Sequence, residues 1–418
     1  MKNKILSIFN LEKDKIFYFT ILGFEKILIL LFHFYFVNYF TSESYGIYSQ
    51  TNFLSSVFQN ILMFGSAIPF IISFTNSNIS NKFFFNFFIP FSILSVLIVS
   101  TIIVIFGDFF SNFFYGNPIF FEYLLILIIV LTSDIISEYL IVFNRINNRL
   151  LNHSKFIFFR SMLKITSIIT IYLLFEDFYL SFLIASILYL LYSSIFFSRT
   201  LRFRYKNLVS VYLKNKNKID ELLVDGLKFT FLYIIITSSS ILINIMVVNQ
   251  FDINTLAIYN FNFIIASAPL TLVGYVTFYS LPDFSQQYSQ NSSIKKSNFF
   301  KDILFTSVVF ALFFIIAFLL YDTIIYFAKD FYRNRFLFSI IFISNFIFMI
   351  NNFLQFPLLS KKKYSQLIFI TGVSLFLNIS YIYFIAIDFS IITPVVGFFI
   401  ANIFTMILLL ISHIRFNK

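Results

Sequence analysis

Two short segments, one in each half of the chain, decide the predicted fold. Residues 37–48 read VNYFTSESYGIY, and residues 248–259 read VNQFDINTLAIY. The offset between them is 211 residues, close to half of the 418-residue chain, and five of the twelve aligned positions are identical. Each segment lies between two long apolar stretches. The same helix–turn–helix is therefore predicted in both halves, as an internal repeat.

The composition around these segments is that of a membrane protein. Hydrophobic residues make up 59% of the chain and charged residues only 12%, and the mean hydropathy is +0.88. A soluble domain usually has about 45–50% apolar and about 25% charged residues. So few charges leave too little polar surface for a water-exposed protein of this size. The composition excludes a soluble globular protein and makes lipid the main solvent.

Twelve apolar stretches are long enough to cross a membrane, since a helix needs about 20 residues to span roughly 30 Å of hydrocarbon. The predicted spans are 16–40, 47–75, 83–106, 120–143, 156–175, 180–198, 225–249, 255–281, 303–327, 336–358, 367–387 and 391–414. The segments between them are short, so no extramembrane domain is expected.

The basic residues give this arrangement an orientation. With the N-terminus in the cytoplasm, 23 of the 30 Lys and Arg residues fall in cytoplasmic segments, and only Lys329, Arg333 and Arg335 fall in external ones. The positive-inside rule describes such a bias. Both termini are therefore predicted to be cytoplasmic. The net charge of +11 is attributed to topology and to anionic lipid of the inner leaflet, and not to nucleic acid.

The predicted architecture is an all-α polytopic membrane protein made of two six-helix bundles. Residues 1–198 form the N-terminal bundle, and residues 225–418 form the C-terminal bundle. Residues 199–224 form a basic cytoplasmic connector along the membrane surface. Both repeated turns face outside, so the halves share one orientation. This is a parallel repeat about an axis along the membrane normal, as in transporters whose two bundles rock around a central cavity.

Seven ionisable residues lie inside the predicted spans, where each costs about 2.5–3.5 kcal/mol near the centre and normally faces protein or a wet cavity. They are Glu25, Lys26, Asp134, Glu138, Arg160, Lys164 and Lys228.

Two pairs among them share a helix face, because their members are four residues apart. The pairs are Asp134 with Glu138 and Arg160 with Lys164. From their positions in the two neighbouring spans, Glu138 and Arg160 are expected at similar depth in the membrane, and Asp134 and Lys164 one helical turn deeper. One interpretation is a structural salt-bridge ladder between the two helices. The other is a cavity in which the bases bind an anionic substrate and the carboxylates bind a coupling proton.

Uncharged polar residues also recur at helical spacing in two spans: Asn52, Ser56 and Gln59 in one, and Ser344, Asn351 and Gln355 in the other. Such stripes usually mean hydrogen bonds between helices. A sugar-binding role is the alternative.

Several classes of activity lack their sequence signals. The chain has no cysteine, which excludes disulfides, a thiolate metal site and a cysteine nucleophile. It has no phosphate-binding loop of an ATPase and no metal-binding spacing among its three histidines. No enzyme, metal or cofactor is predicted.

Two phrases resemble a known family. Residues 40–50, FTSESYGIYSQ, resemble the phrase F-L-G-x-x-x-Y-G-x-Y of Wzx-type polysaccharide flippases, which belong to the MOP superfamily with the MATE exporters. Tyr45, Gly46 and Tyr48 match its end, whereas Thr41 and Ser42 replace the usual Leu-Gly. Residues 249–274 resemble the corresponding phrase of the second half, including Ala257, Tyr259 and Pro269.

The resemblance implies a flippase of the bacterial inner membrane. It would move an undecaprenyl-pyrophosphate-linked oligosaccharide, such as an O-antigen or capsule repeat unit, to the periplasmic leaflet by cation-coupled alternating access. Arg160, Lys164, Lys26 and Lys228 would be its cavity cations. A polysaccharide polymerase and a chain-length regulator are the expected partners.

Two alternatives remain open. A MATE-like exporter of small cationic molecules would favour acidic cavity residues. A membrane polymerase or transferase would usually carry a large external loop.

Overall fold

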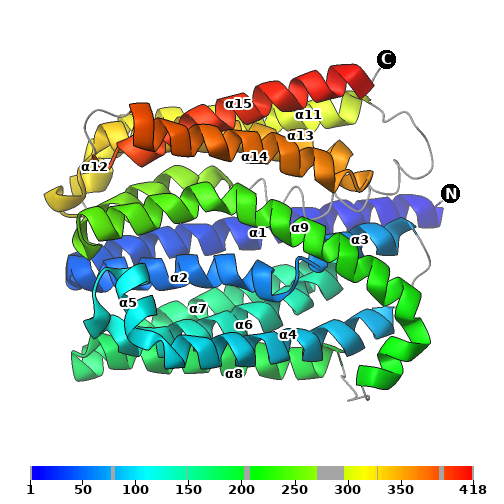
Figure 1. Ribbon diagram of the computed structural model, residues 1–418, viewed down its shortest axis with the longest axis horizontal. Helices are drawn as coiled ribbons and strands as arrows, with labels where there is room; N and C mark the ends of the chain where they lie inside the picture. Colours follow the sequence, from blue (N-terminus) through cyan, green and yellow to red (C-terminus); the bar gives the residue numbers. More distant parts are fainter. Residues whose placement is uncertain are drawn as a thin grey trace.

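The computed structural model describes residues 2–76, 81–147, 149–201, 208–270, 296–326, 328–385 and 390–416. Over these ranges the chain is helical and forms no strand. Most of the long helices lie side by side along the long axis of the molecule (Figure 1). One set runs from α1 to α8 and the other from α11 to α15, with α9 between them (Figure 1).

The first half is organised around α6. Its elements are α1 (Lys2–Tyr39), α2 (Ser42–Leu62), α3 (Ala67–Asn76), α4 (Asn81–Ile105), α5 (Gly107–Tyr115), the 3-10 turn η1 (Pro118–Phe120), α6 (Phe121–Ile146), α7 (Leu150–Phe175) and α8 (Phe178–Leu201). Helix α6 packs against α2, α4 and α8, and α7 packs against α1 and α8. The charged residues of this half therefore lie on helices that are direct neighbours.

The second half is a separate set of packed helices. Its elements are α9 (Leu208–Gln250), a helix at Ile253–Leu270, α11 (Lys296–Leu319), α12 (Tyr321–Tyr326), η2 (Asp330–Tyr332), α13 (Arg335–Ser360), α14 (Tyr364–Ser380), the π-helical turn η3 (Tyr381–Ile385) and α15 (Thr393–Phe416). Helix α15 packs against α13 and α14. Helix α9 contacts α14 and also α2, α3, α4 and α5 of the first half.

The chain is a multi-pass integral membrane protein. Ten of the described helices are long and apolar enough to cross a membrane, and Thr306–Leu319 is a shorter apolar helix. Large apolar side chains such as Leu97, Leu174 and Leu319 are exposed on the outside of the helix packing, where lipid would cover them. Within the described residues each predicted span is helical over most of its length, but the number of crossings stays a prediction.

Helix α2 is absent from those ten because it carries many polar residues, and just over half of its residues are buried. A helix that is surrounded by protein does not need the uniformly apolar surface that lipid demands. Its polar side chains are therefore free to make contacts inside the molecule.

The prediction of one continuous span at 47–75 is wrong. Helix α2 ends at Leu62, and a turn with positive φ at Phe64 and Gly65, both 51°, leads into α3. Gly65 packs tightly against α9, since a Cβ there would lie 2.8 Å from the backbone oxygen of Gly226 and from the nitrogen of Thr230. The break lets the turn approach the α9 backbone.

Three other boundaries differ from the prediction. The span 303–327 divides at Leu320 into α11 and α12. The external segment 107–119, predicted as a loop, contains α5 and part of η1. Residues 208–224 of the predicted connector are the first part of α9, with a kink at Asn215. Residues 202–207 of the connector and 271–281 of the eighth span lie outside the described residues.

Contacts between the halves support the predicted parallel repeat. Ser49 and Asn260 are equivalent at the offset of 211, and Asn260 Nδ2 donates to Ser49 Oγ at 2.9 Å. Equivalent residues contact each other where a two-fold axis passes through an interface. Nearby, Ser42 Oγ donates to Asn254 Oδ1 at 2.6 Å. The two repeated helix–turn–helix segments thus face each other across a pseudo-two-fold axis.

Helix α1 begins and α15 ends at the same end of the molecule (Figure 1). This agrees with termini on one side of the membrane, whereas the identity of that side stays a prediction.

Candidate functional site

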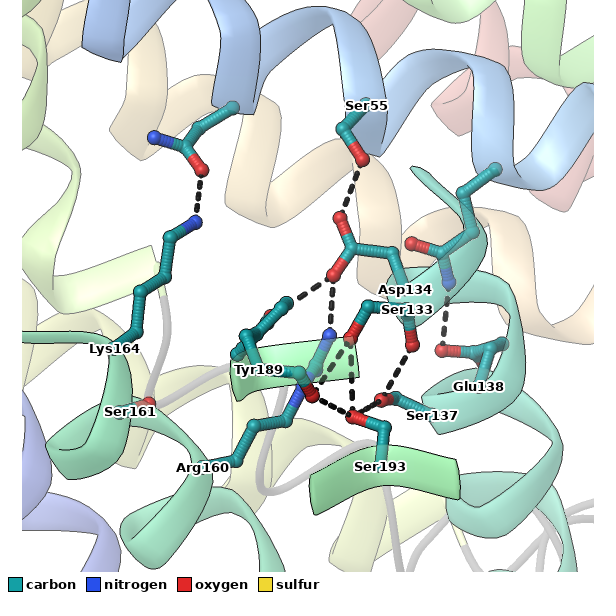
Figure 2. Close-up of polar contacts among 12 residues, drawn as sticks. Ser55, Ser133, Asp134, Ser137, Glu138, Arg160, Ser161, Lys164, Tyr189 and Ser193 are labelled. Atoms are coloured by element: carbon teal, nitrogen blue, oxygen red, sulfur yellow. Dashed lines mark hydrogen bonds and ion pairs between the residues drawn. The ribbon is translucent and has the colours of Figure 1, made fainter. Parts of the chain in front are cut away.

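Charged and polar side chains of α2, α6, α7 and α8 converge inside the first half (Figure 2). The carboxylate of Asp134 on α6 lies at the centre. It forms an ion pair with Arg160 of α7 and accepts hydrogen bonds from Ser55 Oγ at 2.5 Å and Tyr189 Oη at 2.9 Å. The Arg160 guanidinium also lies over the Tyr189 ring, 4.1 Å from its centroid. One carboxylate therefore joins four helices.

The predicted pairing of Glu138 with Arg160 and of Asp134 with Lys164 is wrong. Arg160 pairs with Asp134, which lies one helical turn before Glu138 in α6. The shift follows from the helix ends: α7 begins at Leu150, six residues before the predicted start, and α6 ends at Ile146, three residues after the predicted end. The net difference of about three residues moves Arg160 roughly 4.5 Å along α6. Neither rung of the expected ladder forms, and the ion pair between Asp134 and Arg160 takes their place.

Lys164 takes a neutral partner. Its Nζ donates to Asn52 Oδ1 of α2 and lies 4.9 Å from the centroid of the Tyr189 ring and 5.6 Å from that of Tyr48. The residue is only 8% exposed. Within the described ranges, no carboxylate lies at ion-pair distance from Lys164. Lys164 is thus a buried cation in a polar and aromatic setting.

Glu138 is also bonded to a neutral group, since Gln59 Nε2 of α2 donates to its Oε2 at 3.1 Å. The inward face of α2 consists of Asn52, Ser55 and Gln59 and differs by one residue from the predicted stripe. Ser56 donates instead to the Phe53 carbonyl of its own helix, at 2.7 Å.

Glu25 extends the site to α1. Its side chain is 1% exposed and accepts a hydrogen bond from Ser161 Oγ of α7 at 2.6 Å. The neighbouring Lys26 lies 3.2 Å from the other carboxylate oxygen of Glu25. Ser161 follows Arg160 directly, so α7 contacts the α1 pair and the Asp134 carboxylate from neighbouring positions. Six of the seven predicted intramembrane charges are therefore gathered in one half.

Lys228 does not join this cluster. It is exposed on α9, and no described ion pair or hydrogen bond links it to the other six residues. The nearby Asp225 does not pair with it; Oδ2 of Asp225 lies 2.8 Å from Nζ of Lys362 in the turn between α13 and α14. That pair ties α9 to this turn.

The sequence missed the residues that complete the site. Ser55, Tyr189 and Ser161 supply hydrogen bonds to the carboxylates, and none of them carries a charge that would have drawn notice. Ser133 and Ser193 lie 3.0 Å apart between their hydroxyl oxygens, where α6 packs closely on α8 (Figure 2). The requirement that a buried carboxylate accept hydrogen bonds from neighbouring helices could have pointed to such hydroxyl residues.

The second half contains a smaller, uncharged site on the predicted stripe of α13. Asn351 Nδ2 donates to the Asn402 carbonyl at 2.9 Å, and Asn402 Nδ2 donates to Ser344 Oγ at 3.2 Å. Asn351, Gln355 and Asn402 line a cavity of about 30 Å³, which has room for about two water molecules. The first half thus holds the ionisable groups, and the second holds neutral ones.

In the described part of the chain, no group of three or more His, Asp, Glu or Cys side chains is arranged to hold a metal ion.

Comparison with known proteins places the fold. No protein-family model and no curated protein matches the sequence. Among solved structures, the Vibrio cholerae MATE transporter VcmN, solved as a point mutant, has a TM-score of 0.69 at 12% identity, over 98% of this chain and 97% of that one. Two further structures come from a multidrug resistance MATE family transporter of the MOP superfamily.

The inward-facing form of that transporter has a TM-score of 0.59 at 14% identity, over 90% of this chain and 93% of the other. Its outward-facing form has a TM-score of 0.60 at 13% identity, over 95% and 93%. The similarity extends over nearly the whole of both chains. This chain has the fold of the MATE transporters of the MOP superfamily.

Proposed function

We propose that this protein is a cation-coupled flippase of the bacterial inner membrane. It moves an anionic lipid-linked oligosaccharide, of the undecaprenyl-pyrophosphate kind used for O-antigen or capsule, from the cytoplasmic to the periplasmic leaflet. Two similarly oriented halves that meet across a pseudo-two-fold axis suit alternating access. The MOP-type fold is consistent with transport.

The single observation that supports an anionic substrate is the environment of Lys164. A buried ammonium group is costly unless a negative charge or several dipoles compensate it. Here it has one neutral amide, Asn52, and aromatic ring faces. A phosphate oxygen of the substrate would complete its coordination, and charge-assisted hydrogen bonds to phosphate are strong. The neighbouring rings offer flat faces for the apolar side of a sugar.

Arg160 and the carboxylates would have different duties. Arg160 is already paired with Asp134, so it is available to substrate only if that pair opens. Glu138 accepts from the neutral Gln59 and is the carboxylate best suited to exchange a coupling proton. Glu25 and Lys26 would hold α1 against α7 during the cycle.

A second candidate is export of small molecules. It is favoured by the structural neighbours, which include multidrug MATE transporters, and by the carboxylates Asp134 and Glu138 in the site. A cationic compound would bind there without needing Lys164. The two candidates therefore assign opposite importance to that lysine.

The test is complementation of a flippase-null strain, with surface polysaccharide as the readout. Lys164→Gln removes the substrate cation, and Lys155→Gln is the control because it removes one exposed lysine from the same helix. We expect the native chain and the Lys155 variant to restore polysaccharide, and Lys164→Gln to fail although it reaches the membrane. The Arg160→Ala, Lys164→Ala double variant should also fail.

Normal polysaccharide in the Lys164→Gln and double variants would reject the substrate role of these bases. No complementation by the native chain, together with drug sensitivity in a strain deleted for this gene, would favour the small-molecule exporter.

A further inference from the structure

A second basic site lies at one end of the first half, away from the Asp134 cluster. The C-terminal ends of α6 and α8 and the start of α7 enclose an open cavity of about 370 Å³. Its lining consists of Asn144, Arg149, Asn152, Phe196, Arg199 and Thr200. This set is called the arginine pocket below. It has two guanidinium groups and no carboxylate.

The two arginines are available to a ligand. Both are exposed, and neither forms an ion pair with any carboxylate in the described ranges. The only described contact of the Arg149 guanidinium is with the Phe143 ring, 5.3 Å from its centroid. The positive charge of the pocket is therefore not neutralised by neighbouring side chains.

Asn144 provides an independent observation. It lines the pocket although it is only 1% exposed, and both its amide nitrogen and its amide oxygen are buried without a hydrogen-bond partner among the described residues. A buried amide that lacks partners is costly, so such groups normally bind something. An acceptor atom of a ligand would satisfy its N–H groups.

The backbone adds further donors. Helix α7 begins at Leu150 after Arg149, and no side chain caps its N-terminus. The free N–H groups of a helix start and its dipole favour an anion. All these features favour the same kind of ligand.

We propose that the arginine pocket binds a phosphate group, supplied by the headgroup of an anionic phospholipid. The pocket lies at the end predicted to be cytoplasmic, where anionic lipids of the inner leaflet are concentrated and where basic pockets between transmembrane helices bind lipid headgroups. The bound lipid anchors the α6–α7 turn at the membrane surface. This site is independent of the transported substrate.

The experiment uses the full chain in nanodiscs of phosphatidylcholine with added phosphatidylglycerol. Retained phosphatidylglycerol is measured by native mass spectrometry, and its affinity by titration with a fluorescent phosphatidylglycerol. The test variant carries Arg149→Gln and Arg199→Gln. The control carries Lys214→Gln and Lys216→Gln, which remove the same charge from exposed positions of α9.

We expect the arginine variant to bind phosphatidylglycerol at least about tenfold more weakly, since each basic residue near the surface contributes about 1 kcal/mol. The control should change the affinity less than about twofold. Asn144→Leu, which keeps the charge, should weaken binding several-fold. Equal losses in the two double variants, or no loss in either, would overturn the pocket and leave only non-specific attraction.

Inorganic phosphate as a competitor distinguishes the source of the ligand. Resistance of bound phosphatidylglycerol to millimolar phosphate assigns the pocket to lipid. Displacement by phosphate, with the same dependence on the two arginines, retains the phosphate site but rejects the lipid as its specific ligand.

Discussion

Replacing Asp134 by asparagine is expected to destabilise the protein through the charge it leaves behind. Asparagine has nearly the same shape, but Ser55 and Tyr189 donate to different carboxylate oxygens, and the single amide oxygen can accept from only one of them. The hydroxyl that faces the amide nitrogen can accept from it instead. The main loss in this variant is therefore the negative charge opposite Arg160. The guanidinium would remain inside the helix packing without its counter-ion.

The magnitude follows from the burial of the pair. The Arg160 and Asp134 side chains are 13% and 17% exposed, so both are largely removed from water. Breaking a buried pair costs about 3–5 kcal/mol. The lower end applies here, because Arg160 keeps its contact with the Tyr189 ring, and we expect about 3 kcal/mol. Arg160→Gln should cost about 2 kcal/mol, because Ser55 and Tyr189 still donate to the carboxylate.

The assay is a double-mutant cycle read by the apparent Tm of the purified protein in detergent. At 418 residues, 1 kcal/mol corresponds to roughly 1 °C, so Asp134→Asn should lower Tm by about 3 °C. The double variant has no unpaired charge and should cost no more than Asp134→Asn alone. This gives a coupling free energy of about 2 kcal/mol.

Two results would refute this reasoning. If the effects of the single variants add, the two side chains do not interact energetically. If both single variants leave Tm unchanged, the pair is fully solvated. Transport by the Asp134→Asn, Arg160→Gln double variant, measured where it is folded, separates the two interpretations of these residues. If the pair is only a structural lock, the folded double variant should still transport. If the residues bind substrate or a coupling proton, it should lose transport.

Three further predictions concern the contacts between helices. Ser42→Cys with Asn254→Cys should form one disulfide in this cysteine-free chain, because the native side-chain oxygens are 2.6 Å apart. Oxidation should stop transport, and reduction should restore it. Undiminished transport by the fully cross-linked protein would contradict alternating access at this interface. Gly46→Ala places a Cβ 2.4 Å from the backbone oxygen of Ile253 on the facing helix and should cost about 1–3 kcal/mol of stability. The control Gly372→Ala has nothing within 4 Å of its Cβ and should leave Tm unchanged or higher. Equal effects of the two variants on Tm would reject the close approach at Gly46. Partial burial alone would lower the pKa of Lys362, but its hydrogen bonds to two carboxylates of α9 outweigh this and raise the pKa above its ordinary value. The stability deficit of Lys362→Met, about 1 kcal/mol or roughly 1 °C in Tm, should therefore hold from pH 6 to 9 and disappear as pH rises through that raised pKa. A deficit that grows at high pH would contradict the pairing.

The sequence predicted the membrane class and the repeat because both depend on features that are local or periodic. An apolar stretch of about 20 residues predicts a membrane-spanning helix regardless of how the helices pack. The repeated turns were recognisable by their offset alone, and the Ser49–Asn260 contact supports the axis between the halves. The charges themselves were noticed because a buried charge is rare: six of the seven charged residues singled out lie in the first half, and four of them are close together around Asp134. Lys228 is the exception, because a charge at a helix end and a charge in a cavity look alike in sequence.

The partners of those charges could not be predicted. Errors of three residues in the end of α6 and six residues in the start of α7 were enough to assign Arg160 to Glu138 instead of Asp134, because one helical turn is only about 5.4 Å. The break at Gly65 was equally hidden, because it depends on how closely the α2–α3 turn approaches α9.

The sequence by itself determined that the chain is embedded in a membrane, that its two halves share a repeated segment, and that a few ionisable residues lie inside its apolar stretches. These follow from composition and period, which do not depend on how the helices pack. Only the tertiary structure decided that Asp134 holds Arg160, that Lys164 has a neutral partner, and that two arginines and a buried Asn144 share a pocket. Such contacts join residues that are far apart in the chain, and their geometry depends on helix ends and rotations that no local pattern encodes.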